Sequence, residues 1–235
     1  MLSVFISGLK RQTGKTIVSA GLAATMQSLS YATSFYKPIR TAMGSAYGDL
    51  AFMNKTDPNI KLASCYEFEC SASPLIGAYK SEVKKIDIAQ IVQTYNNSIA
   101  MTECHIVEGA NSISTPIDDK YTEAEIVKQL GLPLILVVNF KSTTLDEVIM
   151  CANYIYTNKI KCFGVILNDY DANNMSVESK YFPHLIKEYT GLKVLGYYPH
   201  YEAGNNVPAE LLIADTLNNL NIEEIFGLKI AKLAN

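Results

Sequence analysis

The chain has 235 residues, and its 20 Lys and Arg residues against 23 Asp and Glu residues give a formal net charge of −3 at pH 7. This length supports a core that needs no disulfides or structural metal, and the slightly acidic balance disfavours a general nucleic-acid binder, which usually carries a basic face. No apolar run reaches the roughly 18 to 20 residues that span a bilayer, and no basic leader precedes the apolar amino terminus, so we expect a cytoplasmic protein without membrane or nucleic-acid partners.

Short runs rich in Val and Ile alternate along the chain with longer segments of helical periodicity. The expected strands are Leu2–Ser7, His105–Glu108, Leu134–Asn139, Phe163–Leu167 and Val194–Tyr197. The expected helices are Thr16–Leu29, Ile86–Tyr95, Thr122–Leu130, Thr144–Thr157 and Val177–Tyr189, with a closing helix after Asn206. Buried strands that alternate with helices predict βαβ units, and therefore an α/β three-layer sandwich with a central, mostly parallel sheet and helices on both faces.

The chain contains no repeat and no Pro, Gly or Ser-rich linker, so a single domain over residues 1–235 is expected. In such a fold the ligand crevice lies beyond the carboxyl ends of the strands. The five cysteines form no CxxC pair and show no zinc-ligand spacing with the three histidines, which favours free, buried thiols over a metal site. A single nucleophilic Cys paired with a His is the alternative.

A glycine-bearing loop joins the first expected strand to the first helix and reads Gly8-Leu9-Lys10-Arg11-Gln12-Thr13-Gly14-Lys15-Thr16. Backbone N–H groups in such a loop cradle phosphates, the lysine adds a positive charge, and the Thr16 hydroxyl reaches Mg²⁺. Five residues separate Gly8 from Gly14 where the standard motif has four, so the loop is a variant. It predicts a P-loop NTPase-like fold that binds a nucleoside triphosphate; an ordinary strand-to-helix turn with an exposed lysine is the alternative.

Three charged residues near other expected strand ends are candidates for the same site. Glu108 ends a buried strand, where a charge needs a partner, and Mg²⁺ bound to phosphates takes one or two carboxylates. Asp49 is a second candidate metal ligand, although alone it would more often cap a helix. Lys37 stands at an expected strand end before Pro38, either to neutralise developing charge or as a solvated surface lysine.

Together these segments resemble dethiobiotin synthetase, the ATP-dependent ring-closing enzyme of biotin synthesis, along nearly the whole chain. The matching segments are the loop ending in Gly14-Lys15-Thr16, Tyr36-Lys37-Pro38 with Thr41, Asp49, Ser73-Pro74, Val107-Glu108-Gly109-Ala110, Lys141, Gly164 with Asn168-Asp169, and Leu195-Gly196 with Pro199.

The resemblance implies a homodimeric enzyme that uses ATP and Mg²⁺ to join CO₂ to the diamine 7,8-diaminononanoate and to close a cyclic urea. It implies catalytic roles for Lys15 and Lys37. The implied nucleotide contacts are Gly8, Gln12, Thr13, Gly14, Lys15, Thr16, Asn168 and Pro199, with Asn168 at the adenine edge. The implied substrate contacts are Arg11, Lys37, Thr41, Gly109 and Ala110, and the implied metal ligands are Thr16, Asp49 and Glu108. Tyr198 or Tyr201 would flank the adenine, with plain surface packing as the alternative.

The chain departs from the family's pattern on the substrate side. Arg11 stands where the family has a threonine that contacts substrate, and Asn111-Ser112 replace two glycines. After Lys141 the family's Leu-Gly-Cys-Ile-Asn-His becomes Ser-Thr-Thr-Leu-Asp-Glu, whose acidic pair disfavours a substrate carboxylate near the helix start. A different small amine or carboxylate substrate, or nucleotide binding without turnover, is therefore one alternative.

A second alternative is a partner-regulated ATPase switch. Lys10 lies five residues before Lys15, which is the spacing of the signature lysine in the deviant Walker A loops of ParA/MinD-like ATPases. In those proteins the lysine reaches across a dimer to the other subunit's phosphates. Here Arg11 and Gln12 replace the glycines that usually follow it, so the match is weak.

Overall fold

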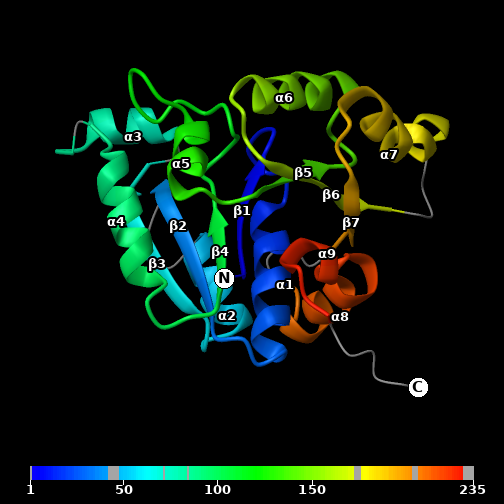
Figure 1. The fold of residues 1–235 in the computed structure, drawn as a ribbon, viewed down its shortest axis with the longest axis horizontal. Coiled ribbons are helices and arrows are strands. Elements are labelled where there is room, and N and C mark those ends of the chain that lie inside the picture. Colours follow the sequence, from blue (N-terminus) through cyan, green and yellow to red (C-terminus); the bar gives the residue numbers. More distant parts are fainter. Residues whose placement is uncertain are drawn as a thin grey trace.

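The structure is a computed structural model and describes residues 2–41, 48–70, 72–83, 85–171, 176–202 and 206–229. Over these residues one sheet has the strand order β3-β2-β4-β1-β5-β6-β7 (Figure 1), and all its strand pairs are parallel. The strands are β1 Leu2–Gly8, β2 Thr33–Thr41, β3 Lys61–Phe68, β4 Cys104–Glu108, β5 Leu134–Asn139, β6 Cys162–Tyr170 and β7 Val194–Pro199. The α/β fold with a parallel central sheet is therefore confirmed.

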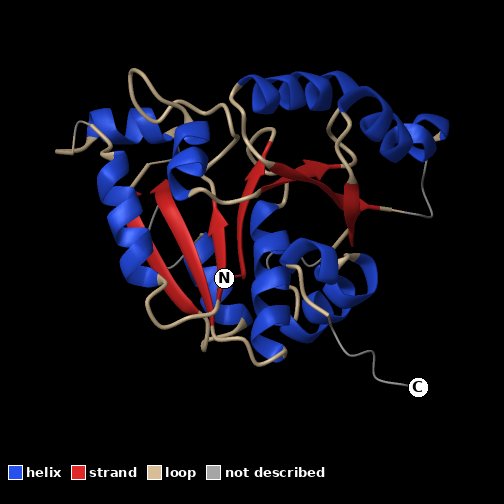
Figure 2. Cartoon of the chain, viewed as in Figure 1, coloured by secondary structure: helices blue, strands red, loops and turns tan. Residues whose placement is uncertain are grey.

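Helices cover both faces of this sheet (Figure 2). They are α1 Lys15–Ser28, α2 Asp49–Thr56, α3 Pro74–Lys80, α4 Ile88–Ser98, α5 Glu123–Leu130, α6 Leu145–Thr157, α7 Val177–Thr190, α8 Ala209–Asn219 and α9 Ile222–Phe226. Side chains alternate along β1, so that Phe5 packs into the cluster with α4 to α7, while Val4 and Ile6 pack into the cluster with α1, α2, α8 and α9. One apolar cluster thus packs against each face of the sheet, as a three-layer sandwich requires.

The expected strands and helices all form, with small shifts at their ends. Strand β2 was anticipated only through the expected strand end at Lys37, and β3, α2 and α3 were not predicted. The edge strand β3 is half-exposed and mixes polar with apolar residues, so it lacks a buried strand's pattern. Helices α2 and α3 have only 8 and 7 residues. The expected closing helix is two helices, α8 and α9, because the chain turns at Leu220 and restarts at Asn221, whose side chain caps α9.

The prediction that Lys37 stands at a strand end is wrong. Strand β2 continues through Pro38 to Thr41, which places Lys37 inside the strand. Pro38 is tolerated because the pairing of β2 with β4 covers only Thr33 to Tyr36, so the missing proline N–H interrupts no bond to β4. The lysine therefore lies where β4 ends and the sheet opens.

The cysteines meet the expectation of free, buried thiols only in part. All five cysteines are free, with Cys104 buried and the other four partly buried. Within the described ranges, no helix is both long enough and apolar enough to cross a membrane.

Candidate nucleotide-binding and catalytic site

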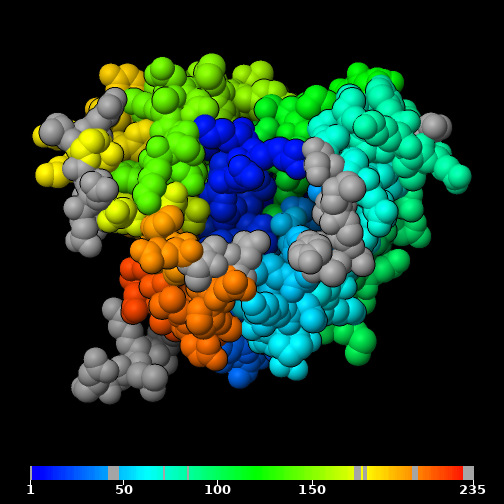
Figure 3. All heavy atoms as spheres, turned by 180° about the vertical axis from the view of Figure 1, so that it is seen from behind, coloured from blue at the N-terminus to red at the C-terminus, as the bar shows by residue number. Residues whose placement is uncertain are grey.

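A cavity of about 820 Å³ opens at the carboxyl ends of β1, β2 and β4. Figure 3 shows this side of the molecule, with the blue amino-terminal segment recessed near its middle. The cavity is lined by Arg11, Gln12, Gly14, Lys15, Thr16, Ile17, Lys37, Ile39, Thr41, Asp49, Glu108, Ala110 and Asn111. Most of the predicted site residues are therefore brought together, from four separate segments of the chain.

The loop between β1 and α1 has the backbone shape of an anion cradle. Gln12 and Gly14 both have positive φ angles, of 59° and 90°, and such left-handed residues turn successive N–H groups into one concavity. A Cβ at Gly14 would also collide with the Asn168 side-chain amide, so only glycine fits there. Helix α1 starts directly after Gly14 with no side-chain cap, which leaves its first N–H groups for a ligand.

The Lys15 ammonium lies inside this cradle and is 6% exposed. Its Nζ donates to the carbonyl oxygen of Asn111 at 2.7 Å and to that of Lys10 at 3.3 Å. Burial lowers the pKa of Lys15, and the nearby Lys37 lowers it further. An anion in the cavity would favour the charged lysine, so phosphate oxygens are natural replacements for the two carbonyls.

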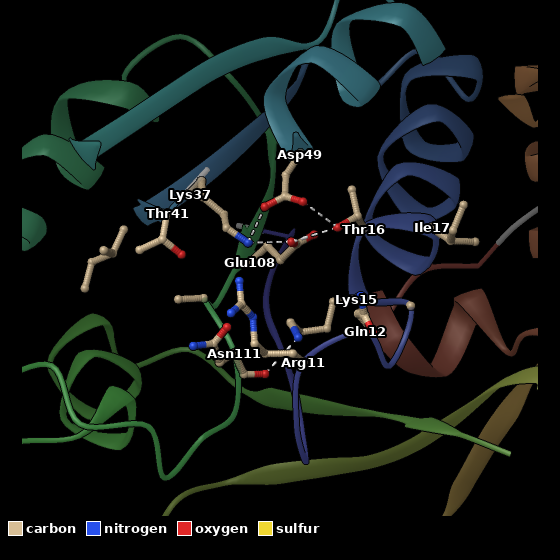
Figure 4. A pocket seen from close by; sticks show the side chains of 13 residues that line it. Arg11, Gln12, Lys15, Thr16, Ile17, Lys37, Thr41, Asp49, Glu108 and Asn111 are labelled. Carbon is tan, nitrogen blue, oxygen red and sulfur yellow. Dashed lines mark hydrogen bonds and ion pairs between the residues drawn. The ribbon is translucent and has the colours of Figure 1, made fainter. Parts of the chain in front are cut away.

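Lys37 joins the two candidate metal carboxylates (Figure 4). Its Nζ lies 2.6 Å from Glu108 Oε1 and 2.7 Å from Asp49 Oδ2, and it donates to the Gly109 carbonyl oxygen at 2.9 Å. Burial alone would lower the pKa of Lys37, but the carboxylates of Glu108 and Asp49 outweigh burial and raise it. The lysine therefore stays charged although it is 3% exposed.

The Thr16 hydroxyl completes the cluster on the opposite side. Its Oγ1 lies 2.8 Å from Asp49 Oδ1 and 3.1 Å from Glu108 Oε1. Glu108 is fully buried, and its second oxygen, Oε2, has no hydrogen-bond partner among the described residues. An unsatisfied buried carboxylate oxygen is costly and therefore marks a place for a cation or donor.

These residues fit a magnesium ion that arrives with a nucleotide. The described part of the chain contains no group of three or more His, Cys, Asp or Glu side chains that would hold a metal alone. Mg²⁺ in phosphate-transferring sites usually takes one or two carboxylates, with phosphate oxygens and waters completing the octahedron. Thr16, Asp49 and the unpartnered oxygen of Glu108 match that requirement.

The other predicted substrate residues lie in or next to the same cavity. Thr41 and Ala110 line the cavity, and Figure 4 shows the Arg11 side chain directed into it. Asn111, which replaces a glycine of the family pattern, also lines the cavity. Gly109 contributes its carbonyl oxygen to Lys37 from just outside the lining.

Four predicted nucleotide contacts do not line this cavity: Gly8 and Thr13, which belong to the phosphate loop beside it, and the more distant Asn168 and Pro199. Asn168, on β6, packs against Gly14 and is 8% exposed. Pro199, at the end of β7, lines a separate cavity of about 540 Å³ with Tyr170, Tyr197 and His200 among others. Their part in binding a base remains a prediction.

The idea that Tyr198 flanks the adenine is wrong, and so is its surface-packing alternative. Tyr198 is fully buried, and its hydroxyl hydrogen-bonds the Thr216 hydroxyl of α8. Its ring packs into the buried cluster that covers α1, α2, α8 and α9 rather than toward a ligand. Tyr201 is partly buried and donates to Asp215 Oδ2 at 2.7 Å.

Lys10 points away from the phosphate cradle toward α6. Its Nζ lies 2.9 Å from Glu147 Oε1 and donates to the Ser142 carbonyl oxygen at 2.6 Å. Glu147 also closes a capping box with Thr144 at the start of α6. Glu147 is one of the two acidic residues that follow Lys141 in the sequence, and it thus pairs with Lys10 of the phosphate loop in the same chain.

One buried residue near the site escaped sequence reasoning. Glu123, the first residue of α5, is 2% exposed and accepts hydrogen bonds from Ser7 Oγ at 2.5 Å and from the Ala110 backbone N–H at 2.7 Å. Burial raises the pKa of its carboxyl group. In the sequence it looks like an ordinary acidic residue at a helix start, so only its long-range contacts reveal it.

A family model described as an AAA domain matches residues 3–207. The chain belongs to this family. Among similar proteins, the ATP-dependent dethiobiotin synthetase BioD of Bacillus subtilis (strain 168) is 25% identical over 94% of this chain and 96% of its own length. The proteins of the same name from Nitrosopumilus maritimus (strain SCM1) and Clostridium acetobutylicum are 28% and 26% identical, over 85% and 97% of this chain and 89% and 98% of their own. The resemblance drawn from the sequence motifs is thereby confirmed.

Two solved structures from Aquifex aeolicus share the fold. The MinC:MinD cell division protein complex matches with a TM-score of 0.59 at 14% identity, covering 100% of this chain and 99% of the matched chain. MinD alone matches with a TM-score of 0.58 at 15% identity, covering 98% and 99%. At such identities the likeness concerns architecture alone, and it confirms the predicted P-loop NTPase-like fold.

Proposed function

We propose that this chain is an ATP- and Mg²⁺-dependent dethiobiotin synthetase, working as a cytoplasmic homodimer whose subunits are single domains of residues 1–235. The observation that carries the proposal is the convergence of Lys15, Lys37, Thr16, Asp49 and Glu108 on one cavity at the P-loop. The three relatives of that name described above match 85% to 97% of the chain, which supports the cavity as the place of the same reaction.

The reaction needs positioning and charge neutralisation more than covalent help from the protein. One amine of the diamine attacks CO₂ and loses a proton, giving a carbamate. A carbamate oxygen attacks the γ-phosphorus of ATP, the bond to ADP breaks, and a carbamic-phosphoric anhydride results. The second amine then attacks the carbonyl carbon, loses a proton and expels inorganic phosphate, which closes the cyclic urea.

Each cluster of residues has a part in this sequence. Lys15 would leave the carbonyls that it now contacts and hold phosphate oxygens. Lys37 would bridge the carbamate and the γ-phosphate, because its buried, permanently charged ammonium stabilises negative charge on both. Bound at Thr16, Asp49 and Glu108, Mg²⁺ would neutralise phosphate charge and align the transferred group.

The remaining predicted residues would bind the two substrates. Gly8, Gln12, Thr13 and Gly14 would supply the phosphate cradle. Asn168 and Pro199 would contact the adenine, reached past the loop on the β6 and β7 side. Arg11, Thr41, Gly109 and Ala110 would face the diamine.

The chain's own substrate-side residues raise a related proposal, in which the acceptor is another small amine or carboxylate, or nucleotide binds without turnover. Arg11 is directed into the cavity, and Asn111 occupies part of its lining. Both add polar bulk on the acceptor side, so the diamine must fit beside them.

The deciding experiment incubates the protein with ATP, Mg²⁺, bicarbonate and 7,8-diaminononanoate and measures ADP release with and without the diamine. The proposal expects diamine-dependent ADP release and one dethiobiotin per ADP. The Lys15→Ala variant serves as the matched inactive control. ADP release that ignores the diamine, together with no dethiobiotin, would leave the other-substrate proposal standing, and no ATP binding at all would remove both.

A MinD-like switch is the second candidate, favoured by the spacing of Lys10 and by its half-exposed side chain. Its pairing with Glu147 in the same chain counts against a role across a dimer. If Lys10 reaches the partner's phosphates, dimerisation should depend on nucleotide and be lost in Lys10→Ala. A dimer that is indifferent to nucleotide and to this substitution would exclude the switch; sedimentation of both proteins with and without ATP distinguishes the two.

A further inference from the structure

The three residues that follow β4 are each held by a buried charged side chain, and we call them the 109–111 segment. The segment forms part of the cavity lining at Ala110 and Asn111. Its three bonds run from Lys37 Nζ to the Gly109 carbonyl oxygen at 2.9 Å, from the Ala110 N–H to Glu123 Oε2 at 2.7 Å, and from Lys15 Nζ to the Asn111 carbonyl oxygen at 2.7 Å.

Glu123 differs from the two lysines because it does not line the cavity. It starts α5, and its other oxygen accepts the hydroxyl of Ser7, which directly precedes Gly8 of the phosphate loop. A carboxylate that is 2% exposed is tolerated only when donors satisfy it, and here both oxygens have one. Glu123 therefore ties together α5, the end of β1 and the 109–111 segment.

The backbone at Gly109 and the Glu123 carboxylate lie in close contact. A Cβ at Gly109 would collide with the Glu123 carboxylate, so glycine at this position leaves the space that Glu123 fills. This close approach sets where the Ala110 N–H points.

Ligand binding would remove two of the three bonds. When the ammonium groups of Lys15 and Lys37 turn to phosphate and carbamate oxygens, the carbonyls of Asn111 and Gly109 lose their donors. The bond to Glu123 does not involve the cavity and can persist. We propose that Glu123 is a positioning residue, which holds the Ala110 amide and with it the substrate-facing wall while both lysines are engaged with ligand.

This inference rests on the proposed function for the identity of the ligands, but its first test needs no turnover. Glu123→Gln retains the shape, and its amide can accept from the Ala110 N–H and donate to Ser7 Oγ. Glu123→Ala removes both bonds, and Glu123→Asp keeps the charge on a side chain too short to hold both partners. Glu125→Ala is the matched control, since Glu125 lies in the same first turn, pairs with Lys128 at 2.7 Å and does not line the cavity.

Hydrogen–deuterium exchange of the Ala110 amide is measured in each protein, with and without the non-hydrolysable analogue AMP-PNP and Mg²⁺. With the analogue bound, exchange should be about tenfold faster or more in Glu123→Ala and Glu123→Asp, and within about twofold of the parent in Glu123→Gln and Glu125→Ala. Exchange in Glu123→Asp and Glu123→Ala that stays within about twofold of the parent would overturn the proposal, as would equally fast exchange in Glu123→Gln. If Glu123→Ala fails to fold, the Asp and Gln variants decide alone.

Steady-state kinetics separates positioning from plain structural support. Glu123→Ala should raise the KM for the diamine about tenfold with little change in the KM for ATP, and Glu123→Gln should restore it. A purely structural residue would lower the Tm and leave both KM values unchanged, which would contradict the proposal. Failure of the parent protein to make dethiobiotin would count against the proposed function and leave the exchange test intact.

Discussion

Replacing Lys37 by Met removes the one ammonium that joins the two carboxylates of the site. The lysine is 3% exposed and lies 2.6 Å from Glu108 Oε1, and Met fills most of its volume without its charge. Breaking a buried ion pair from one side typically costs about 3 to 5 kcal/mol, because the remaining charge stays buried. The Asp49 side chain is 30% exposed, so water screens its interaction with Lys37. We therefore expect Lys37→Met to lower the free energy of unfolding by about 3 kcal/mol, mostly because the Glu108 carboxylate is left unpaired.

A double-mutant cycle with Glu108→Gln, followed by urea unfolding at pH 7, measures how much of this destabilisation comes from the Glu108 carboxylate. In the Gln background no carboxylate is left at position 108, so Lys37→Met should cost less than about 1 kcal/mol, giving a coupling of about 2 kcal/mol. Burial already raises the pKa of Glu108, and loss of Lys37 raises it further. The destabilisation in Lys37→Met is therefore present above that pKa and should shrink as the pH falls through it and the carboxyl takes up a proton.

One outcome of the double-mutant cycle would contradict this account of the site. A coupling below about 0.5 kcal/mol would show that Glu108 does not depend on the ammonium of Lys37, and the charge balance described for the site would be wrong.

Three further outcomes are expected. Lys15→Ala should weaken ATP binding about tenfold to a hundredfold and abolish turnover, because an ammonium contact to phosphate is lost; unchanged affinity by titration calorimetry would show that the loop binds something else. Asn168→Ala should reduce the preference for ATP over GTP about tenfold, and an unaltered ratio of binding constants would remove Asn168 from base recognition. Burial lowers the pKa of His105 from its ordinary 6.5 to about 4, so the unfolded chain binds a proton between these values that the native state excludes. The free energy of unfolding should therefore fall by up to about 3 kcal/mol as the pH drops from 6.5 to 4. His105→Asn should abolish that part of the slope, and a substitution of the exposed His184 should not; an unchanged slope in His105→Asn would contradict the assignment.

The fold was most predictable where a buried strand is rich in Val, Ile and Leu. Strand β2 is buried at eight of its nine positions but contains Lys37 and Pro38, and only its end was expected. Strands β1, β4 and β5 are buried along most of their length, so their Val and Ile runs carry a signal that the helix-spaced segments between them reinforce. Strand β3 lies at the sheet edge with one side open, which allows Lys61 and Ser64 within it and hides the pattern. Helices α2 and α3 are about two turns long, and α2 lacks the marked amphipathic pattern that made the equally short α5 recognisable.

The site was predictable where the residue sits next to a strand end in the sequence. Glu108 and the loop from Gly8 to Thr16 follow β4 and β1 directly, and parallel strands bring such ends to one edge. Lys37 was singled out for the wrong reason, because it lies within β2. Its side chain nevertheless lines the cavity, where the shorter β4 has ended. Glu123 was missed because its partners Ser7 and Ala110 are 116 and 13 residues away along the chain.

Mass spectrometry of a reaction with ¹³C-labelled bicarbonate tests the central claim most directly. The protein, ATP, Mg²⁺ and 7,8-diaminononanoate should yield dethiobiotin carrying one ¹³C atom, with one ADP and one phosphate per product, and Lys37→Met should yield none. Parent protein that binds ATP yet forms no labelled dethiobiotin would contradict the claim that this cavity closes the ureido ring.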